Sequence, residues 1–378
     1  MWVNRILLPL FLVLAILLSL RLAGVFDSSP VKAPAQTEAS PTQAVSQAPP
    51  TTQVTGSSIT KLPYKIAFVS NPDNVVSGYR SYEIYTMGSD GSDLKQIASG
   101  KSSLQWDPPA WSPDGTKIAF LNSVFNIDGT DKMEIEGNSI SWSPDSQFIA
   151  YNAVFIEHTE IFSLNLTNGN MKRLTNNPSF NGKPSWSPDS YKIAFLTGRF
   201  NHGSSIDIGS DICLLDADGG TPSKITYNLW CNRAVWSPDS SKIAFVADSN
   251  FIYIIEIKLG HPMPLVSGME NLGDPAWSPD GKQIAFSASV RDTSNPNFSN
   301  VNLSDIYLIN NDRSSLKKLT AGQGNNSHPI WSPDGTQITF QSDRDGNSEI
   351  YVMNSDGSNQ TRLTHGQGNK YYPVWSPK

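Results

Sequence analysis

A motif that starts Trp-Ser-Pro recurs along most of this 378-residue chain, and that repetition constrains the fold more than any other feature. Six copies continue with Asp, and a seventh begins at Trp375 and runs to Lys378. An apolar segment such as Ile118-Ala119-Phe120 follows each complete copy. A repeated unit of this size buries its surface only against its neighbours, so the copies must pack on one another. The motif residues are Trp111, Asp114, Trp142, Asp145, Trp186, Asp189, Trp236, Asp239, Trp277, Asp280, Trp331, Asp334 and Trp375.

Each repeat contains four segments with the character of β-strands. The first carries the Trp, the second is the apolar segment, the third is typified by residues 349–354, and the fourth ends like Arg362-Leu363-Thr364. These runs are β-branched and aromatic and are bounded by turn residues. We therefore predict an all-β fold, a single β-propeller of about seven four-stranded blades over residues 61–378. The step from Trp111 to Trp142 is only 31 residues, and the number of blades is six if that repeat is not a full blade.

The first and last segments of the repeat region each lack their partner. The strand predicted at 64–69 has no Trp-Ser-Pro motif before it, and the motif segment at 372–376 has no apolar strand after it. Pairing between these two segments would complete one blade and close the ring. Closure of this kind leaves no large unpaired sheet edge, which an open array of blades would expose.

The N-terminus predicts export. Arg5, an apolar run over residues 6–20 and Arg21 form the charged and apolar regions of a secretory signal over residues 1–26. We expect an uncleaved anchor, with a cleaved signal peptide as the alternative. Residues 27–60 are rich in Pro, Ala, Ser, Thr and Gln, which is typical of a disordered linker. The propeller is thus expected outside the cytoplasm, tethered to a membrane, or secreted if the signal is cleaved.

Composition excludes several classes of function. The net charge is −6 and no basic run is present, which argues against nucleic acid as a partner. The two cysteines, Cys213 and Cys231, form neither a disulfide framework nor a metal clip, and either one bridge or two buried free thiols fits them. The five histidines are scattered without a metal-binding motif. We expect no cofactor and no metal, and a monomeric propeller.

The repeated aspartates invite a catalytic interpretation, which we reject. Catalysis needs one constellation of residues, whereas these aspartates recur in nearly every repeat. Ser-Pro-Asp-Gly suits a type I turn between the first and second strands, with Gly accepting positive φ. We expect the motif tryptophans to pack between blades. Residues 343–349 have closely spaced oxygens that would suit Ca²⁺, but a plain turn is the preferred interpretation.

The repeat Trp-Ser-Pro-Asp-Gly-x-x-Ile-Ala-Phe, followed by Glu-Ile-Tyr-Val-Met-Asn and Arg-Leu-Thr, resembles the WD40-like propeller repeat of the TolB family. It is also similar to the propellers of tricorn-type and prolyl-oligopeptidase-type peptidases. The resemblance covers residues 61–378 and implies a propeller that binds protein partners of the cell envelope. The chain departs from TolB where the linker takes the place of a small α/β domain, and from the peptidases in lacking a recognisable hydrolase domain.

A candidate binding face follows from the order of the strands. In a four-stranded meander, the loops between the second and third strands lie on the same face as those that join successive blades. Long loops are expected at 70–81, 197–209 and 287–303, either as functional segments or as tolerated insertions. Aromatic residues and Arg dominate binding hot spots. The candidate residues of this face are Tyr79, Arg80, Trp106, Arg199, Phe200, His202, Trp230, Arg233, Arg291, His328, Tyr371 and Tyr372.

Two functions fit these features. The first is a non-catalytic scaffold outside the cytoplasm that binds an envelope or extracellular protein, or a glycan. The second is a propeller-type enzyme, a polysaccharide lyase or hydrolase with its site in the central funnel. The enzyme requires His, Arg or carboxylate groups that converge on the channel. Three histidines within ligand distance of one another would favour it, and scattered histidines favour binding.

Overall fold

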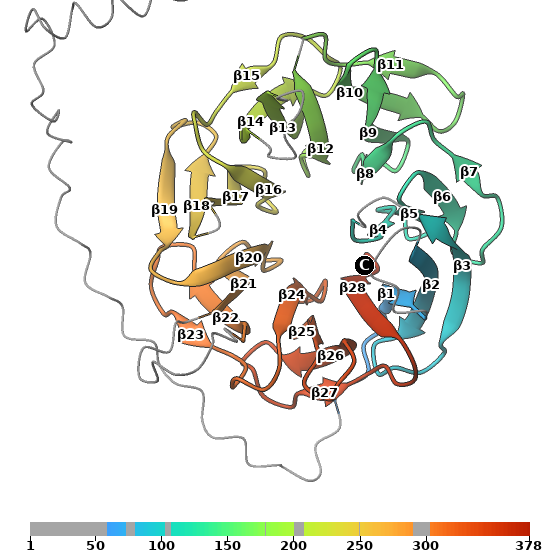
Figure 1. Ribbon diagram of the computed structural model, residues 1–378, viewed down its shortest axis with the longest axis vertical. Helices are drawn as coiled ribbons and strands as arrows, with labels where there is room; N and C mark the ends of the chain where they lie inside the picture. The colour runs from blue at the N-terminus through green and yellow to red at the C-terminus, as the bar shows by residue number, and fades with distance from the viewer. Residues whose placement is uncertain are drawn as a thin grey trace, which may run out of the picture. The chain divides into compact units, whose positions relative to one another are not determined.

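The computed structural model describes residues 59–72, 80–102, 107–177, 179–199, 208–248, 250–289 and 303–378. Seven antiparallel sheets of four strands follow one another around a ring in chain order (Figure 1). The predicted all-β, seven-bladed propeller is confirmed, and the alternative of six blades is wrong. The predicted signal segment at 1–26 and the linker up to residue 58 lie outside the described residues.

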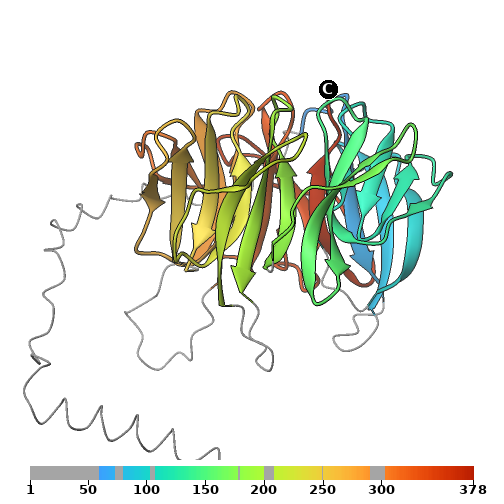
Figure 2. The ribbon, with the colours of Figure 1, turned by 90° about the horizontal axis from the view of Figure 1, so that it is seen from above.

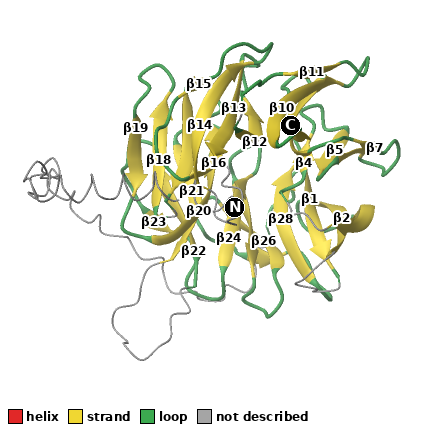
Figure 3. Cartoon of the chain, turned by 45° about the horizontal axis from the view of Figure 1, so that its top comes forward, coloured by secondary structure: helices red, strands yellow, loops and turns green. Residues whose placement is uncertain are grey.

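Figure 3 shows strands and loops, and within the described ranges no residue lies in a helix. In that part of the chain, accordingly, no helical segment has the length and apolar character needed to cross a bilayer.

The blades are numbered in ring order from the sheet that contains the first strand. Blade 1 comprises β28 (Asn369–Trp375), β1 (Lys65–Asn71), β2 (Arg80–Gly88) and β3 (Lys95–Ser102); blade 2, β4 (Ala110–Trp111), β5 (Lys117–Phe120), β6 (Ser123–Asn126) and β7 (Met133–Glu134); blade 3, β8 (Asn138–Trp142), β9 (Phe148–Phe155), β10 (His158–Asn165) and β11 (Met171–Arg173); blade 4, β12 (Phe180–Trp186), β13 (Lys192–Arg199), β14 (Ile208–Asp216) and β15 (Ser223–Lys224); blade 5, β16 (Cys231–Trp236), β17 (Lys242–Ala247), β18 (Phe251–Glu256) and β19 (Pro262–Val266); blade 6, β20 (Glu270–Trp277), β21 (Gln283–Ser289), β22 (Asp305–Asn310) and β23 (Lys317–Lys318); and blade 7, β24 (Asn326–Trp331), β25 (Gln337–Ser342), β26 (Glu349–Asn354) and β27 (Thr361–Arg362).

The strand that carries the Trp lies nearest the ring axis in every blade, and the fourth strand lies at the rim (Figure 1). Figure 2 shows the sheets standing side by side, with connecting loops at both ends of the ring. The 31-residue repeat forms blade 2, which is complete but built from strands of two to four residues. This repeat therefore fits four strands into 31 residues because each of its strands is short.

The chain ends close the ring as predicted. Strand β28 pairs antiparallel with β1, with Trp375 opposite Ile66, and begins three residues earlier than the predicted 372–376 segment. The backbone N–H of Ser376 donates to the Lys65 carbonyl at 2.8 Å, and the Lys65 N–H donates to Ser376 Oγ at 3.0 Å. Ser332 makes the same two bonds with Gln337 within blade 7. The junction thus reproduces the turn of the other blades without a covalent link.

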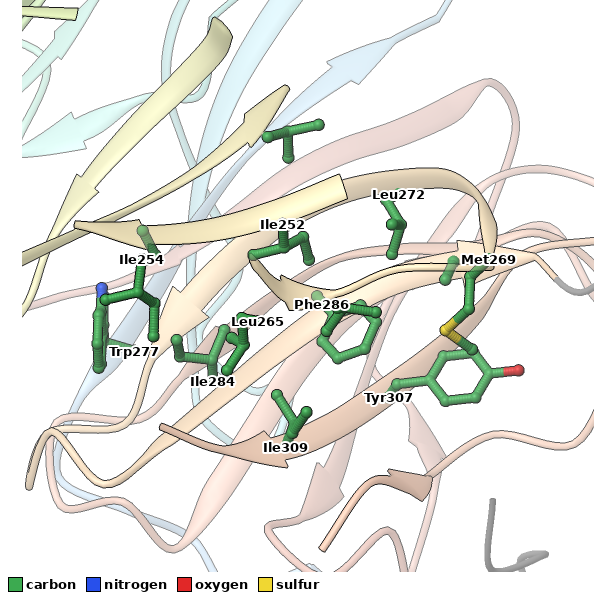
Figure 4. Packing of buried hydrophobic residues seen from close by; sticks show 14 residues of the cluster. Ile252, Ile254, Leu265, Met269, Leu272, Trp277, Ile284, Phe286, Tyr307 and Ile309 are labelled. Atoms are coloured by element: carbon green, nitrogen blue, oxygen red, sulfur yellow. The ribbon is translucent and has the colours of Figure 1, made fainter. Parts of the chain in front are cut away.

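Each blade packs a small side chain against large ones of the next blade. Ala244 of β17 lies in one buried cluster with Ile284 and Phe286 of β21 (Figure 4). The same arrangement joins Ala119, Ala150, Ala194 and Ala285 to the blades that follow them. Ala is small enough to let the neighbouring sheet approach, and the Ile and Phe side chains fill the space between the two sheets. This alternation explains why both faces of the second strand are apolar.

The motif tryptophans connect each blade to the one before it. In six blades, Trp Nε1–H donates to the carbonyl of the residue that precedes the Trp of the previous blade, as Trp331 does to Ala276 at 3.2 Å. The other five bonds measure 3.0–3.3 Å. Trp186 is the exception, since its Nε1–H donates to Ser190 of its own turn at 3.4 Å. Its ring lies 6.4 Å from that of Phe148, which occupies a position that is Lys or Gln in the other blades.

We predict that Trp331→Phe lowers the free energy of unfolding by about 1–2 kcal/mol, because it removes a buried inter-blade hydrogen bond and some packing. Trp186→Phe is the matched control and is expected to cost only a few tenths of a kcal/mol, because its indole N–H bonds outside the blade interface. Thermal and denaturant unfolding of the two variants measures the difference. Equal losses of stability would show that the inter-blade bond contributes nothing.

Candidate functional site

The innermost strands carry a β-bulge three residues before the motif Trp. The pairing register shifts there in β8, β12, β16, β20, β24 and β28. Asp274, His328 and Tyr372 adopt left-handed φ values of 52°, 53° and 57° at this position. A bulge leaves one residue outside the regular pairing and redirects its side chain. The repeat thus presents one variable side chain per blade along the central channel.

Four of these bulge residues lie together and form what we call the channel cluster: Arg233, Asp274, His328 and Tyr372. Arg233 Nη1 lies 3.5 Å from Asp274 Oδ1, and His328 Nε2 lies 3.3 Å from the same oxygen. The His328 ring meets the Tyr372 ring edge-on, with centroids 4.7 Å apart. All four residues line one pocket with Pro108, which comes from blade 2. Four successive blades therefore supply a continuous polar and aromatic surface.

The carboxylate of Asp274 organises the cluster. Its Oδ2 accepts the backbone N–H of His328 at 3.2 Å and the hydroxyl of Ser287 at 3.3 Å. Burial lowers the pKa of His328, and this effect outweighs the raising influence of Asp274, while Arg233 lowers the pKa further. The ring is therefore neutral at pH 7. With Nε2–H directed at Asp274, Nδ1 accepts from Ser327 Oγ at 3.1 Å, so both ring nitrogens have partners within the protein.

The structure brings three of the predicted face residues together and leaves several undetermined. Arg233, His328 and Tyr372 meet in the channel cluster, and the Tyr371 ring lies 6.0 Å from that of Tyr372. Trp230 is 47% exposed on the loop before β16. Arg80 begins β2, and Arg199 ends β13 with its side chain outside the description. Tyr79, Trp106, Phe200, His202 and Arg291 lie outside the described residues.

Asp274 is the cluster member that the sequence analysis missed. The signal was present, because Asp274 stands three residues before Trp277, as Arg233, His328 and Tyr372 stand before their own tryptophans. Alignment of the seven motifs on Trp selects the whole ring of positions, which is Pro108, Ser139, Lys183, Arg233, Asp274, His328 and Tyr372. Grouping the residues by loop, and not by repeat position, leaves Asp274 out.

A second set of carboxylates is buried at the start of the third strand. In blade 7, Glu349 accepts from Thr364 Oγ1 and pairs with Arg362 at 2.6 Å, while Thr364 Oγ1 accepts the backbone N–H of Ile350 at 2.9 Å. In blades 3, 4 and 6, an acidic residue, a Thr and a basic residue at the equivalent positions make the same contacts. Repetition and complete pairing make these groups structural clasps and not a reactive site.

The aspartates of the repeat motif are occupied in their turns. In each of the six turns, Asp Oδ1 accepts the preceding Ser hydroxyl at 2.5–2.7 Å and a backbone N–H two residues ahead at 3.0–3.1 Å. These bonds hold the turn between the first two strands of the blade.

The segment at 343–349 forms a turn that leads into β26, and its three carboxylates, those of Asp343, Asp345 and Glu349, all have partners. Asp343 accepts the backbone N–H of Asn325 at 2.6 Å, and Asp345 accepts from the Tyr351 hydroxyl and pairs with Arg362. Across the described ranges, no group of three or more His, Cys, Asp or Glu side chains is placed to hold a metal ion.

The two cysteines are free and buried, and they lie on neighbouring blades. Burial raises the pKa of Cys213 to about 11 and that of Cys231 to about 12. A thiol of this kind is not ionised at neutral pH and is not a nucleophile.

Comparison with known families matches almost the whole repeat region. The family model described as the TolB beta propeller domain matches residues 52–251 and 210–378. The "Tol-Pal system protein TolB" of Francisella tularensis subsp. mediasiatica (strain FSC147) is 27% identical over 207 residues, covering 53% of this chain and 44% of that protein. The "Uncharacterized peptidase YuxL" of Bacillus subtilis (strain 168) is 27% identical over 209 residues, covering 49% of this chain and 30% of that protein. The match thus spans less than half the length of these relatives.

The fold is shared with an enzyme as well. The oligogalacturonate lyase of Vibrio parahaemolyticus superimposes with a TM-score of 0.53 at 14% identity, over 72% of this chain and 85% of that one. A likeness at this level of identity establishes a common propeller architecture and carries no information on activity.

We predict that the His328 ring titrates below the ordinary histidine pKa of about 6.5, because burial disfavours the charged form. The side-chain resonance is assigned by its loss in His328→Gln, and its shift is followed by NMR as the pH falls. Asp274→Asn removes the nearest carboxylate and should lower the midpoint further. Since the folded pKa is depressed, protonation opposes folding, and stability should fall as the pH drops below about 6.5 toward that pKa. A midpoint above the ordinary value would contradict this electrostatic account.

Proposed function

The chain belongs to the TolB β-propeller domain family, and we propose that it is a scaffold held outside the cytoplasm whose propeller binds a protein of the cell envelope. Two considerations support this location. The charged and apolar pattern of residues 1–26 is that of a secretory signal. A relative that matches half of this chain is named for the Tol-Pal system. The linker at 27–60 would space the propeller from the membrane.

The channel cluster is the observation that carries this proposal. Arg and Tyr are over-represented among the residues that contribute most to protein–protein affinity, and a rigid, pre-formed surface reduces the entropy lost on binding. Here the bulges set the backbone conformation, and Asp274 makes polar contacts of 3.2–3.5 Å with Arg233 and His328. Trp230 adds an exposed indole at the end of the blade where its innermost strand begins. A partner that enters the channel from this face meets an aromatic and polar surface that is already ordered.

An enzyme is the second candidate, and the cluster is also the observation that bears on it. A lyase or hydrolase in the funnel would use His328 as a base and Arg233 to bind a substrate carboxylate. Both nitrogens of His328 already have partners, so its lone pair is not available without rearrangement. The other described histidines lie on β10, in the β18–β19 turn and in the β27–β28 loop. By the criterion of converging histidines, the described residues favour binding over catalysis.

We predict that Trp230→Ala lowers capture of the partner at least about tenfold, because loss of an exposed hot-spot indole costs binding free energy without disturbing the core. The tagged full-length chain is cross-linked in its native envelope, purified, and the co-purifying proteins are quantified by mass spectrometry.

Tyr191→Ala is the matched control. Tyr191 is 75% exposed, but it lies in the turn between the first and second strands of blade 4, at the opposite end of the ring. Its removal should leave capture unchanged. If both variants, or neither, reduce capture of the same protein, the proposed face is wrong. Release of unsaturated products from oligogalacturonide by the wild-type chain, and not by His328→Ala, would instead favour the enzyme.

A further inference from the structure

The turn between the third and fourth strands of a blade rests on the outer strand of the blade before it. A Lys of that outer strand donates to a backbone carbonyl of the turn: Lys95 to Asp128 at 3.4 Å, Lys317 to Asp356 at 2.7 Å, and Lys172 to Asp218. The residue after each of these aspartates is Gly, with φ between 89° and 96°. This Lys-and-Gly contact closes the rim between three pairs of blades.

At Gly129 and Gly357, space as well as φ requires Gly, whereas a Cβ at Gly219 would lie 3.5 Å from Lys172 Cε, an ordinary contact. A Cβ at Gly129 would lie 2.6 Å from the Ile97 carbonyl oxygen, and one at Gly357 would lie 3.1 Å from that of Leu319. A side chain here therefore pushes the turn away from the preceding blade or is itself displaced.

The boundary between blades 5 and 6 lacks both elements of this contact. Met263 of β19 occupies the position of the Lys, and Arg313 occupies the position of the Gly with φ 75°. A left-handed conformation is costly for a side chain such as Arg and is found where the surrounding structure imposes it. A pocket of about 380 Å³ lies at this boundary, within the size range of ligand-binding cavities.

The pocket has an apolar floor and a charged rim. Ile254 and Leu265, whose packing in the buried cluster is seen in Figure 4, line the floor of the pocket, and Met263 extends it with 41% exposure. One wall is the ion pair of Lys242 with Glu256, 3.1 Å apart and partly exposed. The opposite wall is the turn Asn311-Asp312-Arg313.

The charges of the rim select among ligands. Two cationic and two anionic side chains surround the opening, so a phosphate or a polyanion would meet Glu256 and Asp312 as well as the cations. A peptide backbone is neutral and offers both N–H donors and C=O acceptors to such a rim. The apolar floor, formed by three side chains, matches a single large apolar side chain.

We propose that this pocket between blades 5 and 6 binds an extended peptide segment of a partner protein, with one large apolar side chain inserted onto Ile254, Met263 and Leu265. The site goes beyond the proposed function of the channel face. It lies at the end of the ring where the first-to-second-strand turns also lie, so it would bind a second segment or a second partner.

Restoring the repeat tests this proposal without weakening the fold. The double variant Met263→Lys/Arg313→Gly introduces the residues that close the same contact elsewhere, and Arg313→Gly alone relieves the left-handed Arg. The probes are short fluorescent peptides, blocked at both ends, that carry Ala, Leu, Met, Phe or Trp at the centre of a Gly-Ser sequence. Fluorescence anisotropy measures their binding to the full-length chain and its variants.

The wild-type chain should bind the peptides with a large apolar centre at least about tenfold more tightly than the Ala peptide. The double variant should lose this preference while its melting temperature equals or exceeds that of the wild type. Trp230→Ala should leave peptide binding unchanged, which separates this site from the channel face. Equal binding of all peptides, retention of the preference in the double variant, or a lower melting temperature in that variant would each overturn the proposal.

Discussion

Contact between the small face of one blade and the large face of the next is the constraint on which this ring depends. Ala244 packs against Ile284 and Phe286, and equivalent contacts between a small and large side chains recur between most of the blades. Sheets that pack face to face need interdigitated side chains at interior density, and an Ala row against an Ile and Phe row supplies them with a constant spacing. The indole N–H of the motif Trp then adds a directional hydrogen bond to the same interface. This bond fixes the position of one blade along the ring axis relative to the previous blade.

The polar groups that such packing buries are hydrogen-bonded, and the same hydrogen bonds recur from blade to blade. The Ser and Asp of each turn bond to one another and to the backbone, and Thr364, Arg362 and Glu349 form the clasp at the opposite end of their blade. Because these groups are used within each blade, their recurrence in the sequence reflects folding. The bulge position differs, since its residue is Pro, Ser, Lys, Arg, Asp, His or Tyr according to the blade. A position that the fold holds in place and leaves chemically unrestricted is suited to recognition.

The difference between repeated and variable positions also determines how much of the structure the sequence predicts. Blade number, strand order and ring closure depend on features repeated at every turn, so the motif and its period predicted them. The channel cluster depends on bulges, and a bulge has no signature in residue type when its residue varies from Ser139 to Tyr372. Asp274 was missed because its position is marked by its distance from the motif Trp and not by residue type, whereas Arg233 and His328 were selected for their side chains. At Trp186, where the indole bonds within its own turn, the ring lies beside Phe148, which is 38 residues away in the sequence and on another blade.

Departures from the repeat therefore carry more information about function than the repeat itself. A substitution that fills a position normally held by Gly for steric reasons costs stability, and a position that loses its Lys loses an inter-blade bond. Arg313 and Met263 combine both losses at one boundary, and the result is a pocket and not a collapsed contact. The boundaries between blades 1 and 2, 3 and 4, and 6 and 7 show that the closed arrangement, with Lys and Gly at these two positions, is available to this fold. The open arrangement between blades 5 and 6 leaves the space on which the proposed peptide site rests.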